Sequence, residues 1–197
     1  MKKLESEFYT RADVVQVAKD LLGKIIVTNI ENKLTAVMIT ETEAYAGSTD
    51  RASHAFGNKH TNRTDAMFKN GGIAYVYLCY GLHHLFNVVT NIEGIPHAVL
   101  IRAGEPIEGI SHMLDRRKKS KLEKTITNGP GSLCGALGIT ISHNKISLNS
   151  SLIWLAEFKE IEENQIRISA RVGVDYAGQD ALLPYRFRII NNPFTGK

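Results

Sequence analysis

Two carboxylates and a tyrosine occupy alternate positions in the stretch ITETEAYAG. Alternate residues of an extended strand point to the same face, so Val37, Ile39, Glu41, Glu43 and Tyr45 are predicted to share one face. An unpaired buried carboxylate is costly, so a glutamate that follows valine and isoleucine is either paired or used in chemistry. This stretch alone leaves open a simpler alternative, in which the strand leaves the core after Ile39 and ends in water.

A second group of chemically capable residues lies in a strand pair over residues 73–91. Tyr75, Tyr77 and Cys79 are predicted to share one side of the first strand, and Tyr80 comes immediately before the turn. One hairpin would therefore offer aromatic rings to an interior pocket and another ring at a projecting tip. Tyrosines in strands also serve as ordinary cross-strand packing, and that alternative stays open for each of them.

These residues must be positioned by a chain that is rich in predicted strands. A helix is expected from about Arg11 to Leu22, with Thr10 as its cap and Gly23 as its stop, and a second helix is expected to open at Glu105 and Pro106 and end in a basic run. A short helix is predicted within 131–138, and 46–72 form a long polar loop. Strands are predicted over 24–30, 34–45, 73–80, 84–91, 97–103, 151–157, 166–174 and 185–190.

Many strands, few helices and short connections predict an α+β fold: a curved, mainly antiparallel sheet with a protruding hairpin and flanking helices. The 197 residues contain no repeat and no linker, so 1–197 are expected to form a single domain. The N-terminal stretch MKKLESEFYT lacks the apolar core of a signal peptide, and no run approaches membrane-span length, so no membrane partner is expected. The two cysteines, Cys79 and Cys134, suit a reducing compartment.

The charge distribution favours a polyanionic partner. The net charge is +4 with a pI of about 9.0, and the stretch RRKKSKLEK carries six cations against one anion. Four further cations gather in and beside the long loop: Arg51, Lys59, Arg63 and Lys69. Solvated loops are the alternative for both groups.

A half-buried carboxylate, aromatics that could sandwich a flat ring, a protruding tyrosine and a basic surface are together the parts needed to act on a base taken out of a duplex. Extruding a base costs roughly a few kcal/mol. Stacking on aromatic side chains returns about 1–3 kcal/mol per base, which is comparable. A wedge residue in the vacated space slows the return of the base, and Tyr80 is the candidate.

The segment ETEAYAGSTDRASHAFGNKHTNRTDAMFKNGGIAYVYLCYGLHHLFNVV closely resembles the alkyladenine, or 3-methyladenine, DNA glycosylase family of bacteria and mammals. Further blocks agree downstream: AVLIRAGEPIEG, TNGPGSLCGALGI, ARVGVDYAG and PYRFRI. The resemblance runs from about Leu4 to Asn191. It implies a base-excision repair enzyme that hydrolyses the bond between deoxyribose and a damaged purine, alkylated or deaminated, and leaves an abasic site.

Roles of individual residues follow from the resemblance. It implies that Glu43 is the general base that activates water, and that Arg102 and the main-chain carbonyl of Val172 help to hold this water. Glu41 is not the catalytic acid of the family, and a structural or electrostatic role is expected for it. The lesion pocket is implied to be walled by three residues: Tyr45, His54 and Tyr77.

Two further residues are implied to act on the DNA. Asn87 would exclude normal guanine by crowding its exocyclic amino group, and Tyr80 would insert into the duplex. A purine alkylated on a ring nitrogen is cationic and leaves readily, and electron-rich rings would favour it through cation–π attraction. Relatives commonly resemble GPGKL where this chain has Ser132, so one lysine that could contact phosphate is missing.

The resemblance also implies the partners and the place of action. The expected partner is double-stranded DNA that contains damaged purines, bound by a monomer without a metal or other cofactor. No lysine matches a Schiff-base nucleophile, so hydrolysis without strand cleavage is expected. The place would be the cytoplasm, at the nucleoid, in a bacterium and the nucleus in a eukaryote.

The residue types alone leave three rival hypotheses open. A non-catalytic nucleic-acid-binding module could use the basic loops alone. A sugar glycosidase could use Glu41 and Glu43, which lie roughly 6.6 Å apart along a strand, near the lower end of the about 6.5–9.5 Å typical of inverting enzymes. A metal site is disfavoured, because the histidines lack the spacing that clusters ligands on one element.

Overall fold

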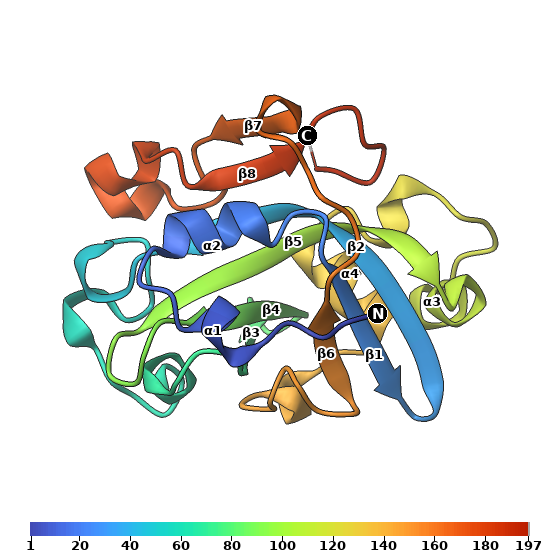
Figure 1. Ribbon diagram of the computed structural model, residues 1–197, viewed down its shortest axis with the longest axis horizontal. Coiled ribbons are helices and arrows are strands. Elements are labelled where there is room, and N and C mark those ends of the chain that lie inside the picture. The colour runs from blue at the N-terminus through green and yellow to red at the C-terminus, as the bar shows by residue number, and fades with distance from the viewer. Residues whose placement is uncertain (197) are drawn as a thin grey trace.

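The computed structural model describes residues 1–196 and places eight strands in one sheet (Figure 1). The order is β3–β4–β5–β2–β1–β6, and the antiparallel pair β7–β8 joins this sheet where β8 pairs with β2. The strand pairs are antiparallel. The strands are β1 (Ile25–Ile30), β2 (Lys33–Tyr45), β3 (Ala74–Cys79), β4 (His83–Thr90), β5 (His97–Glu108), β6 (Ile153–Ala156), β7 (Ile166–Ser169) and β8 (Arg186–Ile189).

Four α-helices flank the sheet. They are α1 (Ser6–Tyr9), α2 (Val14–Asp20), α3 (Ile110–Arg117) and α4 (Pro130–Leu137). Helix α2 packs on β2 and β5, α4 packs on β4 and β5, and α3 packs on α4. Short 3-10 helices occur at Gly47–Thr49, Phe56–Asn58, Asp65–Phe68, Lys124–Ile126, Ile141–His143, Glu163–Gln165 and Asp175–Leu182. Three of them lie in the predicted long loop 46–72, which is therefore partly structured.

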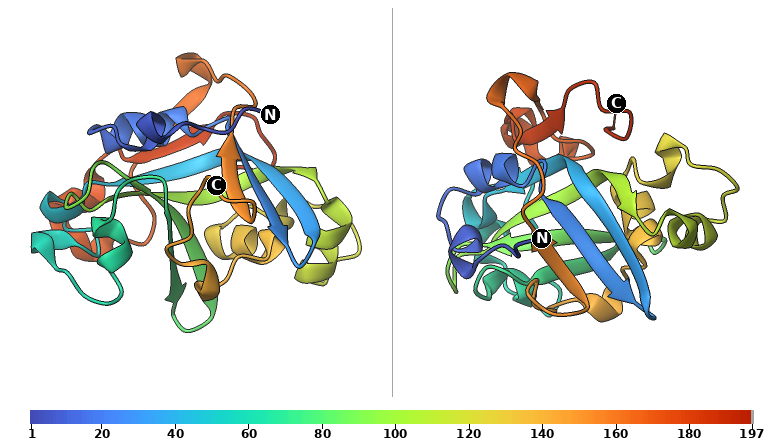
Figure 2. Two further views of the ribbon diagram at one scale, coloured as in Figure 1. Left: turned by 60° about the horizontal axis from the view of Figure 1, so that its bottom comes forward. Right: turned by 45° about the vertical axis from the view of Figure 1, so that its right-hand side comes forward.

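The sheet is curved, and the β3–β4 hairpin projects from it. Strand β2 lies at the centre because β5 pairs along one edge, while β1 and then β8 pair along the other. The two views of Figure 2 show the curvature. In the left view, the β3–β4 hairpin extends away from the body. The predicted α+β fold with a curved, mainly antiparallel sheet and a protruding hairpin is confirmed.

The prediction that Ile39 and the two glutamates share a face of β2 is wrong, because the strand carries a β-bulge. Ile39 lies opposite Gly104 and Glu41 lies opposite Ala103, so Thr40 is an extra residue. Gly104 and Ala103 are neighbours in β5, so they face opposite sides of the sheet. Their partners, Ile39 and Glu41, therefore face opposite sides as well. Ile39 packs in the main core, whereas Glu41 contacts Arg102 on the other face.

The helix predicted to open at Glu105 and Pro106 begins later. Both residues belong to β5, where they lie opposite Met38 and Val37, and the register shifts directly beyond Pro106, which has no N–H to donate. Gly109, with φ of 70°, ends the strand, and α3 begins at Ile110. The expected ending in the basic run is confirmed, since α3 ends at Arg117.

The N-terminal helix is shorter than predicted and has a different cap. Asp13 rather than Thr10 caps it, since its carboxylate accepts from the backbone N–H of Gln16 at 3.0 Å. Thr10 instead ends the short helix α1. The predicted strand over 166–174 is also shorter, because β7 ends at Ser169.

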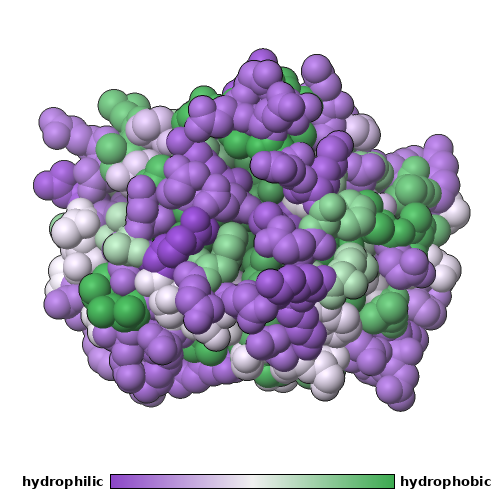
Figure 3. Space-filling model, viewed as in Figure 1, coloured by the Kyte–Doolittle hydropathy of each residue, from purple (hydrophilic) through white to green (hydrophobic). Residues whose placement is uncertain are grey.

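The two largest clusters of the core lie on opposite faces of the sheet. The larger cluster packs α2 and α4 against one face and includes Val88 and Val99. A smaller cluster on the other face includes Val89 and Ala98 and lies under the loop 46–72. The view in Figure 3 is largely hydrophilic, with hydrophobic residues in small separate patches. Within residues 1–196, no helix has both the length and the apolar character that a membrane crossing requires.

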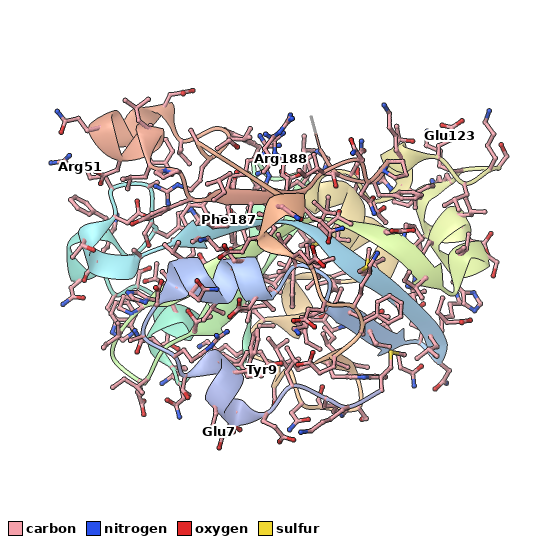
Figure 4. All side chains as sticks on the ribbon, turned by 45° about the horizontal axis from the view of Figure 1, so that its top comes forward. Glu7, Tyr9, Arg51, Glu123, Phe187 and Arg188 are labelled. Atoms are coloured by element: carbon pink, nitrogen blue, oxygen red, sulfur yellow. The ribbon has the colours of Figure 1, made fainter. Side chains whose placement is uncertain are left out.

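The two basic segments lie at opposite ends of the molecule. In Figure 4, Arg51 marks the end formed by the long loop, and Glu123 marks the end formed by the basic run after α3. Whatever the run RRKKSKLEK contacts, it does not lie beside the loop that contains Arg63.

Candidate active site

A pocket of about 410 Å³ opens on the face of the sheet opposite α2, within the range of roughly 300–1,000 Å³ that small-molecule sites occupy. Its walls come from the hairpin, the end of β2, β5, the loop 46–72 and the segment 172–176. Of the predicted site residues, those that line it are Tyr45, His54, Tyr77, Tyr80, Asn87, Arg102 and Val172. The fold therefore brings together residues that lie far apart in the sequence.

Glu43 lies directly behind the wall of this pocket. Its side chain is fully buried. Oε1 accepts a hydrogen bond from the backbone N–H of Val172 at 2.8 Å, and Oε2 accepts from the Tyr45 hydroxyl at 2.9 Å and from Arg102 Nη1 at 3.3 Å. All three donors line the pocket, whereas Glu43 does not. Three converging donors suit an ionised carboxylate, which only accepts.

The carboxylate of Glu43 retains acceptor capacity. A carboxylate offers about four lone-pair sites, and the three donors above leave one of them on Oε1. That oxygen lies beside the backbone of Val172. The backbone N–H of Val172 is thus a partner of Glu43 itself, a contact that the sequence did not suggest.

Glu41 holds Arg102 from the other side. Glu41 Oε1 accepts from Arg102 Nε at 2.9 Å and from Arg186 Nε at 2.7 Å, and Oε2 accepts from the backbone N–H of Gly196 at 2.8 Å. Burial opposes the charge of Arg102, but Glu43 and Glu41 outweigh it and raise the pKa of Arg102. Glu41 does not line the pocket. The two glutamates therefore share an arginine rather than face each other across a cleft.

His54 is held in one tautomer by its two neighbours. Nε2 lies 3.3 Å from Arg63 Nη2, and Nδ1 lies 2.9 Å from the Tyr75 hydroxyl. A guanidinium group only donates, so we assign Nε2 as an acceptor and Nδ1 as the protonated nitrogen. Burial, with the charge of Arg63, lowers the pKa of His54 to about 4. His54 is therefore a neutral wall of the pocket at pH 7.

The tyrosine walls also remain uncharged. Burial raises the pKa of Tyr45 well above its ordinary value, and the neighbouring Glu43 raises it further. Burial likewise raises the pKa of Tyr77. The ring of Tyr77 contacts His54 edge-on, with 4.8 Å between ring centroids. These rings form a stiff, aromatic lining.

Asn87 is fixed at the pocket wall. Its side chain is buried, and Nδ2 donates to the carbonyl of Tyr75 at 3.0 Å. The partner lies directly across the β3–β4 pair. A side chain held in this way cannot turn aside easily, which suits a steric role.

Tyr80 stands at the hairpin tip. It is 92% exposed and adopts a positive φ of 50° in the turn that joins β3 to β4. It also borders the pocket. Leu78 and Leu82, on either side of Tyr80, are exposed as well, at 46% and 76%. The predicted projecting aromatic is confirmed as a structural feature.

Sequence reasoning missed two residues at the pocket. Arg63 was noted only as one of four loop cations, and Tyr176 was not singled out, although both line the pocket. The Tyr176 hydroxyl donates to the carbonyl of Ala52 at 3.0 Å, which ties the segment 172–176 to the loop 46–72. Neither residue has a periodic or spacing signal, because both lie in irregular segments.

The histidines do not form a metal site within residues 1–196. No group of three histidine, cysteine or acidic side chains in this part of the chain is placed to bind a metal ion. Cys79 and Cys134 are both free thiols.

This combination suits the class of enzymes that act on a single base taken out of a duplex and held in a stacked pocket, among them the DNA glycosylases. The family model described as methylpurine-DNA glycosylase (MPG) matches residues 7–193. The chain therefore belongs to the methylpurine-DNA glycosylase family. This membership supports DNA glycosylase activity, a hydrolase reaction of base-excision repair.

Three bacterial relatives carry the name "Putative 3-methyladenine DNA glycosylase". The protein from Chlamydia felis is 46% identical over 185 residues, which cover 93% of this chain and 94% of its own length. That from Natranaerobius thermophilus is 46% identical over 195 residues, with 98% of each chain covered. That from Clostridium novyi is 43% identical over 204 residues, with 100% of each covered.

Proposed function

We propose that this protein removes damaged purines, alkylated or deaminated, from duplex DNA by hydrolysing the N-glycosidic bond with a water that Glu43 activates. One observation carries the proposal: all three hydrogen-bond donors to the buried carboxylate also line the aromatic pocket. A base in that pocket would present its sugar to the side of the wall where Glu43 lies. The product is an abasic site.

In the proposed reaction, the water oxygen bonds to the anomeric carbon while the bond from that carbon to the purine nitrogen breaks. Glu43 takes the proton of the water through the free lone pair on Oε1, and the purine leaves with the bonding electron pair. The anionic carboxylate also stabilises the positive charge that develops on the sugar. Arg102 and the carbonyl of Val172 would hold the water.

The pocket walls would select and hold the base. Tyr45, His54 and Tyr77 would stack on it, which offsets the cost of extruding it from the duplex. Asn87 would crowd the exocyclic amino group of guanine, and its fixed bond to the Tyr75 carbonyl supports this role.

The absence of strand cleavage is part of the proposal. No lysine is among the residues that line the pocket within 1–196. A Schiff-base intermediate needs an amine nucleophile beside the sugar. We therefore expect a monofunctional glycosylase.

The rival hypotheses fit the site less well. A sugar glycosidase of the inverting type needs two carboxylates that flank the substrate, whereas Glu41 and Glu43 share Arg102 behind the wall. A pure binding module has no use for a buried carboxylate bonded to pocket residues.

We further propose that the protein acts as a monomer on double-stranded DNA, through one catalytic domain over 1–197. We propose the cytoplasm as its place of action, as suits its bacterial relatives.

Chromatography of the purine released from DNA treated with a methylating agent tests the proposal. We expect free methylated purine and an intact strand that breaks only on later treatment with alkali. A protein that binds this DNA yet releases no base would be a binding module. Covalent trapping by borohydride would contradict the monofunctional mechanism.

Replacing Tyr80 by alanine is expected to lower excision from duplex DNA more than from single strands. The ring would fill the space that the flipped base leaves, and a single strand has no such space to fill. One stacked aromatic is worth about 1–3 kcal/mol, so the loss on duplex should be at least several-fold. Single-turnover rates on matched duplex and single-stranded oligonucleotides measure it. Equal losses on both would count against a wedge, and Leu34→Ala at another exposed site is the control.

A further inference from the structure

Two arginines lie against two of the tyrosines that line the pocket, Tyr77 and Tyr45. The guanidinium carbon of Arg63 lies 4.8 Å from the ring centroid of Tyr77, and that of Arg171 lies 4.8 Å from the ring centroid of Tyr45. Arg63 lines the pocket, whereas the side chain of Arg171 is fully buried behind Tyr45. A cation that lies against a ring repels a second cation that approaches the same ring. The ring of Tyr77 is thus a poorer cation acceptor than that of a free tyrosine, whereas the charge of Arg171 is paired with Asp50.

The charge of Arg63 is not compensated at the pocket. Arg63 and Arg102 are the charged residues that line it within 1–196, and Arg102 is paired with two carboxylates. Arg63 has no such partner in this part of the chain. The nearest acid in sequence, Asp65, pairs with Lys145 and His60 instead. The pocket therefore presents one uncompensated positive charge to whatever enters.

The neighbours of Arg63, an exposed residue at the pocket, carry no opposite charge. His54 accepts a hydrogen bond from Arg63 and is neutral, and Tyr75 and Tyr77 are un-ionised phenols. Asp50 pairs with Arg171 on the far side of Tyr45. A base between Tyr45 and Tyr77 would thus lie close to the charge of Arg63, with no exposed anion beside it.

We propose that Arg63 is a specificity-determining residue that makes this pocket favour neutral damaged purines over cationic ones. The inference rests on the proposed function. A purine methylated on N7 carries a positive charge that Arg63 repels at short range, whereas a deaminated purine such as hypoxanthine is neutral. Hypoxanthine also offers oxygen and nitrogen acceptors to the guanidinium donors.

The test compares release of 7-methylguanine and of hypoxanthine from duplexes of identical sequence, with spontaneous loss subtracted. In Arg63→Gln, the ratio of the second-order rate constant for 7-methylguanine to that for hypoxanthine is expected to rise about five- to tenfold, as loss of one close cation demands. Phosphate contacts carry no information about the base, so weaker DNA binding cancels in the ratio. An unchanged ratio in Arg63→Gln would overturn the inference.

Two further variants separate charge from structure. Arg63→Lys keeps the charge and should keep the wild-type ratio within about twofold; a ratio like that of Arg63→Gln would also overturn the inference. Lys59→Gln removes an exposed cation of the same loop that does not line the pocket, and it should slow both reactions equally. Release of neither base by the wild type would refute the proposed function, and this inference with it; release of both with an unchanged ratio would refute only the inference.

Discussion

Replacing Glu43 by glutamine is expected to lower the rate of base release by at least about 10²-fold, the loss typical of a missing general base. The two side chains have nearly the same shape, but an amide cannot take a proton from water. Lesion binding should survive, because Glu43 lies behind the wall and does not line the pocket. Single-turnover release of hypoxanthine, together with the dissociation constant for the same duplex, measures both effects.

The control for Glu43→Gln must account for hydrogen bonds that an amide cannot reproduce. Glutamine would point an amide N–H at one or more of the three groups that now donate hydrogen bonds to Glu43. At least one of these hydrogen bonds will be lost, and some stability with it. Thermal unfolding of the variant shows how much. Glu105→Gln is the matched control, because Glu105 lies on the adjacent strand β5 and bonds Asn192 away from the pocket. Equal rates for the Glu43 variant and the wild type would contradict general-base catalysis.

Replacing Asp50 by alanine is expected to reduce the free energy of unfolding by about 3–5 kcal/mol, because it leaves the buried guanidinium of Arg171 unpaired. Both side chains are almost fully buried, at 1% and 0% exposure. Asp50 also accepts from the backbone N–H groups of Ala46 and Ala52 at 3.1 and 3.0 Å. Urea unfolding at pH 7 measures the loss.

Two comparisons make the result for Asp50 specific. Glu5→Ala breaks an exposed ion pair with Lys2 and should change stability by at most about 1 kcal/mol. The double variant Asp50→Ala with Arg171→Met removes the unpaired charge as well and should recover part of the stability. An Asp50→Ala variant as stable as Glu5→Ala would show that the pair contributes little to the fold.

The Asp50–Arg171 pair matters for function because of where it lies. Arg171 Nη1 donates to the carbonyl of Ala44 at 2.9 Å, Nη2 donates to that of Asp180 at 3.1 Å, and the next residue is Val172. The backbone N–H of Val172 donates to Glu43. The Asp50–Arg171 pair thus ties the segment that contains Val172 to the loop 46–72. Destabilising it should loosen both walls of the pocket together.

The sequence predicted the hairpin and its faces correctly because strand periodicity is local. Tyr75 and Tyr77 alternate with buried core residues and line the pocket, and Tyr80 lies at the exposed tip. The resemblance to the family, rather than periodicity, supplied residues from distant segments such as Arg102 and Val172. Those residues lie beside Glu43.

Periodicity failed where pairing between strands overrides local preference. The bulge at Thr40 turns the glutamates away from the face of Ile39, and no local signal marks it. Glu105 and Pro106 have the residue types of a helix start, yet pairing with β2 keeps them in a strand. The arginines against Tyr45 and Tyr77 come from irregular segments, whose course only tertiary packing decides.

The most direct measurement is a crystal structure of the Glu43→Gln variant bound to a duplex that contains one hypoxanthine. We expect the hypoxanthine between Tyr45 and Tyr77, the ring of Tyr80 in the vacated stack, and a water that contacts residue 43 and faces the anomeric carbon. A hypoxanthine that remains stacked in the duplex, or that lies in the pocket with its sugar turned away from residue 43, would contradict the mechanism.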